Sequence, residues 1–264
     1  MTNTASADRR AFGAIWTLLF AASTVATIVW CASMSAMPEM PMPGGWHMSM
    51  AWMRMPGQTW AGSAASFLGM WVVMMAAMML PCLLPSLLRY RQAVGGPGVP
   101  RLGRLTALVG LAYFLVWTAF GAIAYLLGVA LAAAEMESRA LARAVPIAVA
   151  AVVLGAAALQ FTRWKARHLA CCRDAPGHCG ALPADAHTAW RHGLRLGLHC
   201  STCCVGLMAI LLVVGVMDLR AMAVVGAAII LERVAPAGER IARATGAVGV
   251  GAGLLLLGRA AGGG

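Results

Sequence analysis

The chain has 264 residues, of which 61% are hydrophobic and only 11% are charged, and its mean hydropathy is +0.79. Soluble domains carry roughly 25% charged residues, so this composition excludes a soluble domain and indicates an integral membrane protein. The net charge of +11 comes almost entirely from arginines that lie between apolar runs. Because no basic groove interleaved with aromatic residues accompanies them, we do not expect nucleic acid as a partner.

Seven apolar runs predict transmembrane helices, and the sixth is short enough that it need not cross the bilayer. The runs cover residues 12–32, 64–88, 105–132, 144–161, 197–217, 218–235 and 241–258. The first is expected to be a retained helix, with a cleaved signal peptide as the alternative. The last is rich enough in glycine for close helix contact. The predicted fold class is therefore all-α, a polytopic helical membrane protein with one transmembrane domain over residues 1–264.

The distribution of basic residues predicts the orientation of the chain. With a cytoplasmic N-terminus, fifteen of the twenty Arg and Lys residues fall on the cytoplasmic side and five on the other, as the positive-inside rule requires. This predicts a multi-pass protein of the bacterial inner membrane, with a Met-, Pro- and Trp-rich segment at 33–62 outside and a Cys- and His-rich loop at 162–196 inside. Cytoplasmic thiols are kept reduced, so these cysteines are expected to bind metal or act in redox chemistry.

The strongest candidate site is the run from His199 to Cys204 at the cytoplasmic mouth of the fifth helix. Residues four apart share a helix face, which aligns His199 with Cys203 and Cys200 with Cys204. Three thiolates and an imidazole form a compact set of soft ligands that suits Cu(I), zinc or an iron–sulfur cluster. The alternative is that these cysteines are small apolar residues in helix packing.

A second group of soft ligands lies upstream in the predicted cytoplasmic loop. It consists of His168, Cys171, Cys172, His178 and Cys179. This group could complete the first site, form a separate relay, or be incidental to a polar loop.

Methionines form a ladder along the second predicted helix. Met70, Met74, Met78 and Cys82 follow each other at intervals of four, and Met75 and Met79 run beside them. Thioethers are neutral and prefer Cu(I) to hard cations, so the ladder could be a ligand path, although such a stripe is more often packing. Two prolines, at 81 and 85, loosen this helix near the predicted site.

The external segment 33–62 holds eight of the eighteen methionines. They are Met34, Met37, Met40, Met42, Met48, Met50, Met53 and Met55. Thioethers outlast thiols on the oxidising side, so this segment could capture Cu(I). An interfacial amphipathic stretch, anchored by Trp46, Trp52 and Trp60, is the equal alternative.

The chain shows few signs of enzyme chemistry. No Asp or Glu falls in the middle of a predicted span, which disfavours proton-coupled transport. Glu232 and Arg233 lie at a helix end and are expected to neutralise each other or to face water. We find no phosphate-binding loop and no hydrolase triad in sequence order, so we expect no enzyme unless the thiols carry out redox chemistry.

Several segments resemble a bacterial family of predicted metal-binding integral membrane proteins whose function is unassigned. The resemblance covers most of the chain from the second predicted helix onward, and four segments carry it: 71–85 (WVVMMAAMMLPCLLP), 160–173 (QFTRWKARHLACCR), 193–208 (GLRLGLHCSTCCVGLM) and 215–236, with Met217 and Glu232. Thr202 and Val205 stand where the family usually has Gly and Trp around the vicinal cysteines. The resemblance implies a metal-binding membrane protein but supplies neither metal nor reaction.

Together these patterns predict a membrane protein that binds and hands on a soft transition metal, most readily copper as Cu(I), with zinc as the second choice. The candidate ligands are His199, Cys200, Cys203, Cys204, Cys171, Cys172, Cys82, Met78 and Met74. The expected partners are membrane lipid, the copper ion and a protein that donates or accepts metal. The alternatives are thiol–disulfide redox chemistry, carriage of another thiophilic ion such as mercury, and a purely structural role of the cysteines.

Overall fold

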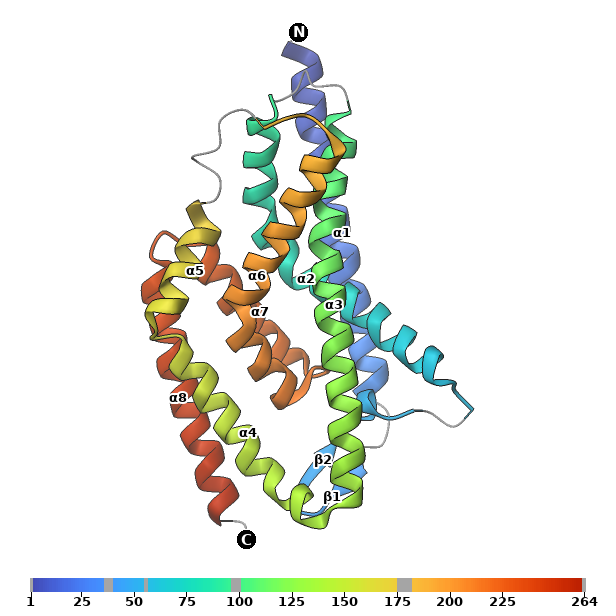
Figure 1. The fold of residues 1–264 in the computed structure, drawn as a ribbon, viewed down its shortest axis with the longest axis vertical. Helices are drawn as coiled ribbons and strands as arrows, with labels where there is room; N and C mark the ends of the chain where they lie inside the picture. Colours follow the sequence, from blue (N-terminus) through green and yellow to red (C-terminus); the bar gives the residue numbers. More distant parts are fainter. Residues whose placement is uncertain (1, 36–39, 55–56, 96–100, 175–181, 263–264) are drawn as a thin grey trace.

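The computed structural model describes residues 2–35, 40–54, 57–95, 101–174 and 182–262. The elements are α1 (Thr2–Ser35), β1 (Met40–Met42), β2 (Trp46–Met48), the 3-10 helix η1 (Met50–Trp52), α2 (Trp60–Ala93), α3 (Leu102–Glu137), α4 (Arg139–Leu159), α5 (Arg163–Asp174), α6 (Ala186–Gly215), α7 (Leu219–Val234) and α8 (Gly238–Gly262). The prediction of an all-α fold is confirmed, since helices make up nearly all of the described chain (Figure 1).

Six helices in the described part of the chain are long and apolar enough to cross a membrane, which confirms a polytopic fold. They are 10–34 of α1, and α2, α3, α4, α6 and α8. Helix α7 has 16 residues, or about 24 Å at 1.5 Å per residue, which is shorter than the ~30 Å hydrocarbon layer. Helix α7 nevertheless runs in the opposite direction to α6 and α8. The two termini lie at opposite ends of the long axis (Figure 1).

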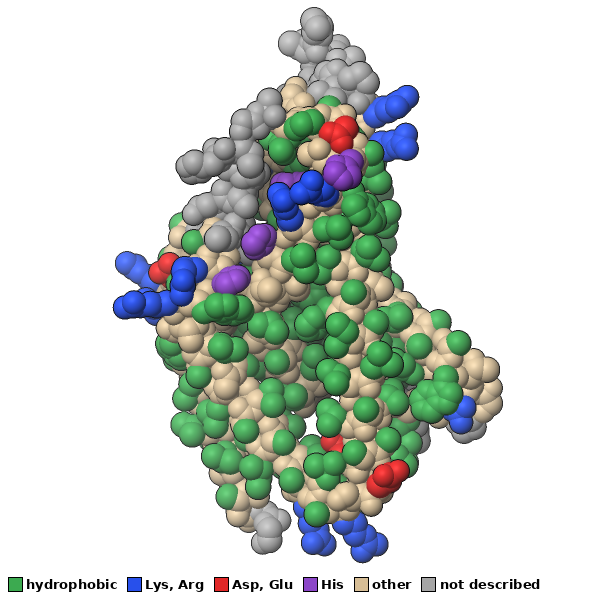
Figure 2. Space-filling view, viewed as in Figure 1, with side chains coloured by type: hydrophobic (Ala, Val, Ile, Leu, Met, Phe, Trp, Pro, Cys, Tyr) green, Lys and Arg blue, Asp and Glu red, His purple; other side chains and the backbone are tan. Residues whose placement is uncertain are grey.

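Hydrophobic side chains are spread along the length of the bundle on the face that Figure 2 shows. Leu18, Leu126, Val224, Val248 and Leu255 are between 67% and 73% exposed. Continuous exposed apolar surface of this kind is unfavourable in water and is expected of helices that face lipid.

Helix α2 forms the centre of the bundle, packed against α1, α3 and α7. Its buried face carries Met70, Met74, Met75, Met78 and Met79. The helix bends midway along its length (Figure 1). Pro81 and Pro85 lie inside it, and proline removes a backbone hydrogen bond and kinks a helix.

Glycines allow neighbouring helices to approach closely. A Cβ added at Gly197 of α6 would lie 2.9 Å from Val116 of α3, and one at Gly253 of α8 would lie 2.7 Å from Leu154 of α4. Both separations are shorter than ordinary carbon contacts, so these positions require glycine. The expected close contact of the glycine-rich last helix is therefore present.

Replacing Gly121 with alanine is expected to destabilise the fold by about 1–3 kcal/mol, the usual cost of overpacking a filled core. The new Cβ would overlap the ring of Trp71. That ring cannot move freely, because it is fully buried and its Nε1 donates to the Trp117 carbonyl at 2.9 Å. Thermal unfolding in detergent measures the effect. Gly110→Ala on the same helix is the matched control, since its added Cβ would meet nothing within 4 Å, and equal losses for the two variants would contradict the packing explanation.

The Met-rich segment folds onto the bundle around a small hairpin. Strands β1 and β2 pair antiparallel, with Met40 opposite Met48. Trp46 Nε1 donates to the Ala142 carbonyl at 2.8 Å, and Trp52 packs against Phe67 with ring centres 5.3 Å apart. These two tryptophans therefore contact protein, whereas Trp60 is 57% exposed and fits the predicted interfacial anchor.

The segment 162–196, predicted as a loop, is largely helical in its described part. It contains α5 and the first turns of α6. Asp185 caps α6 by accepting from the Thr188 backbone N–H at 2.8 Å, which satisfies an orphan donor of the first turn. Ala189, Gly193 and Leu196 are buried at helical spacing, so the helix extends well beyond its apolar run.

Candidate metal centre

Three cysteines of α6 form the core of the candidate site. Cys200, Cys203 and Cys204 are 0%, 2% and 2% exposed and are present as thiols. The three residues lie within about one turn of α6, and all belong to its buried face. The helical spacing thus places three thiols side by side on the part of α6 that faces the inside of the bundle.

The sulfur of Cys200 is the point on which four helices converge. The Tyr113 hydroxyl of α3 donates to it at 3.0 Å, and Arg233 Nη1 of α7 donates to it at 2.6 Å. Met79 Sδ of α2 lies 4.0 Å away. A guanidinium and a phenol directed at one sulfur favour the thiolate, which is the form that binds metal.

A second set of charged groups lies directly beside the thiols. Lys165 Nζ of α5 donates to the Cys203 carbonyl at 2.9 Å and pairs with Glu232 Oε2 at 2.7 Å. Gln160 Nε2 donates to the other oxygen, Oε1, at 2.7 Å. The expectation that Glu232 and Arg233 face water is wrong, because both are buried. Glu232 pairs with Lys165 and Arg233 donates to Cys200.

Lys165 remains a cation in these surroundings. Burial works to lower the pKa of Lys165, but the neighbouring Cys203, Glu232 and Cys204 outweigh burial, so its pKa lies above the ordinary value. The lysine and Glu232 are only 4% and 2% exposed. A buried charge without its partner is costly, so the two groups depend on each other.

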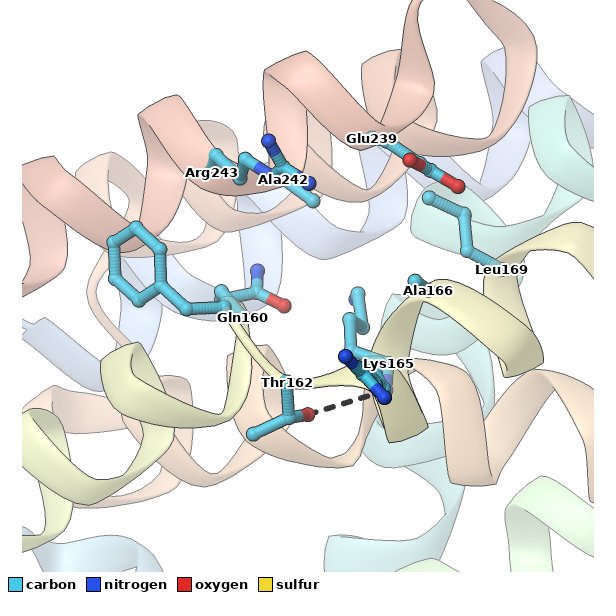
Figure 3. Close-up of a pocket in the computed structure, with 10 residues that line it drawn as sticks. Gln160, Thr162, Lys165, Ala166, Leu169, Glu239, Ala242 and Arg243 are labelled. Atoms are coloured by element: carbon cyan, nitrogen blue, oxygen red, sulfur yellow. Dashed lines mark hydrogen bonds between the residues drawn. The ribbon is translucent and has the colours of Figure 1, made fainter.

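A small cavity of about 70 Å³ adjoins this charged set. Figure 3 shows it between the α4–α5 junction, which supplies Gln160, Thr162 and Lys165, and the first turns of α8, which supply Glu239 and Arg243. The cavity therefore reaches two of the groups that hold Glu232.

The other predicted ligands with described side chains differ in how far they are buried. Cys82, Met74 and Met78 of α2 are buried, and Cys82 interacts electrostatically with Cys200 and Cys203. His199 is exposed, so the buried cluster contains the three cysteines and not this imidazole. The ligand role of each of these residues stays a prediction.

The upstream group is only partly described. Cys171 and Cys172 fall in the last turn of α5, but their side chains, like His178 and Cys179, lie outside the described residues. His168 packs on Trp164 with ring centres 4.2 Å apart, and its Nδ1 lies 2.9 Å from the Trp164 carbonyl oxygen.

The donor set is one of sulfur rather than of His and carboxylate. Within the described ranges, no three His, Cys, Asp or Glu side chains are arranged as a ready metal site. The further soft donor in contact with Cys200 is the Met79 thioether. Thiolate and thioether together suit Cu(I) and are poor ligands for hard cations.

Sequence reasoning missed the groups that surround these sulfur atoms. Met79 was noticed only as a neighbour of the methionine ladder, and Tyr113 was not singled out. Lys165 appears only within the segment 160–173 that carries the resemblance, and Glu232 appears in the resemblance and as the expected neutralising neighbour of Arg233. The signal that could have found them is the rarity of ionisable groups in an apolar chain, where such groups are functional candidates by default.

The fold and the site define a polytopic helical membrane protein with a buried centre of thiols and thioether. A family model described as "PpoB2: Copper chaperone" matches residues 68–256, so the chain belongs to this copper chaperone family. The matched range includes every residue of the centre, and the match agrees with the metal-related bacterial family that the sequence resembles. No curated protein and no solved structure matches the chain.

Proposed function

We propose that this protein binds copper as Cu(I) at the Cys200–Met79 pair and hands it to a partner protein at the bacterial inner membrane. The observation that carries the proposal is the buried Cys200 sulfur, which has a thioether 4.0 Å away and two donors directed at it. A metal–thiolate bond is about 2.3 Å for zinc. Two sulfur atoms 4.0 Å apart are therefore close to the separation that one shared ion requires.

Charge favours the monovalent ion at this position. With the Arg233 guanidinium beside the Cys200 thiolate, bound Cu(I) leaves one net positive charge and a divalent ion would leave two, and charge in the apolar interior is costly. Arg233 and Tyr113 can hold the thiolate before copper arrives. Cys203, Cys204 and Cys82 then provide further sulfur ligands for an ion that is being passed on.

The methionines of α2 provide a route to the centre. Met70, Met74 and Met78 are buried and follow one another at about 6 Å of helical rise. An ion that exchanges one thioether for the next is never without a ligand. The route needs no internal energy source if the ion moves from neutral thioethers to a thiolate that binds it more tightly.

Thiol redox chemistry is the second candidate function. The observation in its favour is that Cys200 and Cys204 lie four residues apart on the buried face of α6, so each has a thiol near it with which a disulfide could form. In that case the protein would lose two thiols on oxidation and would retain no metal under reducing conditions.

Competition titration of the full chain in detergent, under anaerobic reducing conditions, tests the copper proposal. Replacing Met79 with leucine keeps the volume and removes the thioether, and we expect Cu(I) affinity to fall by more than about tenfold, since even groups outside the ligand set contribute about 10- to 100-fold to metal affinity. Met136→Leu is the matched control, because Met136 is 56% exposed on α3. Unchanged affinity of the Met79 variant, or tighter binding of Zn²⁺ than of Cu(I) by the unmodified chain, would contradict the proposal.

A further inference from the structure

A larger cavity of about 240 Å³ lies where α1, the chain after η1, the start of α2 and the α6–α7 turn meet. A water molecule occupies about 30 Å³, so this cavity has room for several small groups. It is separate from the cavity beside Lys165, with which it shares no lining residue.

Four methionines from these four segments line the cavity. They are Met34, Met53, Met70 and Met217. Met70 is buried, and the other three are half-buried, so their side chains are not fully taken up by packing. No His, Cys, Asp or Glu is among the lining residues.

The remaining lining includes polar groups that already have partners. Ser63 accepts from the Tyr125 hydroxyl at 2.9 Å, and Gln58 donates to Ser66 at 3.4 Å. These groups allow water into the cavity. The thioethers are therefore the side chains available to an entering soft ion.

We infer that this cavity is a Cu(I) entry site in which Met34, Met53, Met70 and Met217 are the ligands. The inference rests on the proposed function, because the ion would move on from Met70 along α2. Neutral thioethers select Cu(I) against Zn²⁺, Mg²⁺ and Ca²⁺. Without a thiolate the cavity holds the ion less tightly than the Cys200 centre, so transfer runs toward the cysteines.

The methionines that line this cavity come from segments that are far apart in the sequence. Met217 comes from the α6–α7 turn, whereas Met34 and Met53 belong to the Met-rich segment. Two of the four cavity methionines thus come from the Met-rich segment, and the third is Met217. The fourth, Met70, is the first residue of the methionine ladder on α2. This arrangement distinguishes an entry site from general enrichment in methionine.

Methionine footprinting with Ag(I), a redox-inert ion with the same preference for sulfur, tests the inference on the unmodified full chain. Bound Ag(I) is expected to slow oxidation of Met34, Met53 and Met217 to the sulfoxide, measured by mass spectrometry of peptides. Met136, exposed and outside the cavity, is the internal control. Equal protection of Met136, or no protection of the three cavity methionines, would overturn the inference.

A second measurement separates this inference from the proposed function. In a background in which Cys82, Cys200, Cys203 and Cys204 are all replaced with alanine, one weakly held equivalent of Cu(I) is expected to remain and to disappear when Met34, Met53 and Met217 are replaced with leucine. Met136→Leu in the same background should retain that equivalent. An equivalent that survives the triple substitution overturns the entry site. If Cys200→Ala alone leaves tight Cu(I) binding intact, the proposed function at Cys200 is contradicted. The Ag(I) footprinting result still tests the entry site independently.

Discussion

Replacing Cys200 with alanine is expected to weaken Cu(I) binding by more than about 100-fold, because outer groups alone contribute 10- to 100-fold to metal affinity and a direct ligand contributes more. Cys200 is fully buried, and its sulfur accepts hydrogen bonds from Tyr113 and Arg233 and contacts the Met79 thioether. The substitution removes the sulfur to which both donors are directed. Competition titration of the full chain in detergent measures the loss.

Cys31→Ala is the matched control for this prediction. Cys31 is also a buried thiol, 1% exposed, but it lies on α1 and not among the α6 sulfur atoms. The two variants should therefore lose similar stability from the removal of a buried thiol, and only their Cu(I) affinities should differ. Equal copper affinity in both variants would remove Cys200 from the centre.

Replacing Lys165 with methionine is expected to destabilise the protein by about 3–5 kcal/mol, the usual cost of leaving one member of a buried ion pair without its partner. Its ammonium lies 2.7 Å from Glu232 and 2.9 Å from the Cys203 carbonyl. Unfolding by heat or by SDS in mixed micelles measures the change. Arg163→Met, on an exposed position of the same helix, should change stability by less than about 0.5 kcal/mol.

The double variant Lys165→Met with Glu232→Gln tests whether the lost pair is the cause. Because glutamine carries no charge, the second substitution should restore part of the stability, and the two effects should be far from additive. Additive losses would indicate that Lys165 acts through packing and not through Glu232.

The helical framework could be predicted from the sequence because each membrane helix satisfies its own backbone and is marked by its own apolar run. Candidate ligands that lie on a single helix could also be predicted from the sequence. The spacing of Cys200, Cys203 and Cys204 and the ladder from Met70 to Cys82 depend only on 3.6 residues per turn. Helix α7 was the uncertain element for a physical reason, since its 16 residues are close to the limit of what can span.

The contacts between helices could not be predicted in this way. Whether Met79 meets Cys200, or Glu232 meets Lys165 rather than Arg233, is decided by the bend in α2 and by the placement of α5. A single sequence contains no periodic signal for such pairings. The Met217 contribution to the second cavity is hidden for the same reason, since Met217 lies 147 positions after Met70 in the chain (217 minus 70).

The most direct test of the central claim is copper X-ray absorption on the full chain, purified anaerobically and loaded with one equivalent of Cu(I). The account predicts a first coordination shell of sulfur only, which is lost in the Cys200→Ala variant and kept in Cys31→Ala. A shell of nitrogen or oxygen would contradict a thiol–thioether centre. Failure to retain copper, together with reversible loss of two thiols, would instead assign the cysteines to redox chemistry.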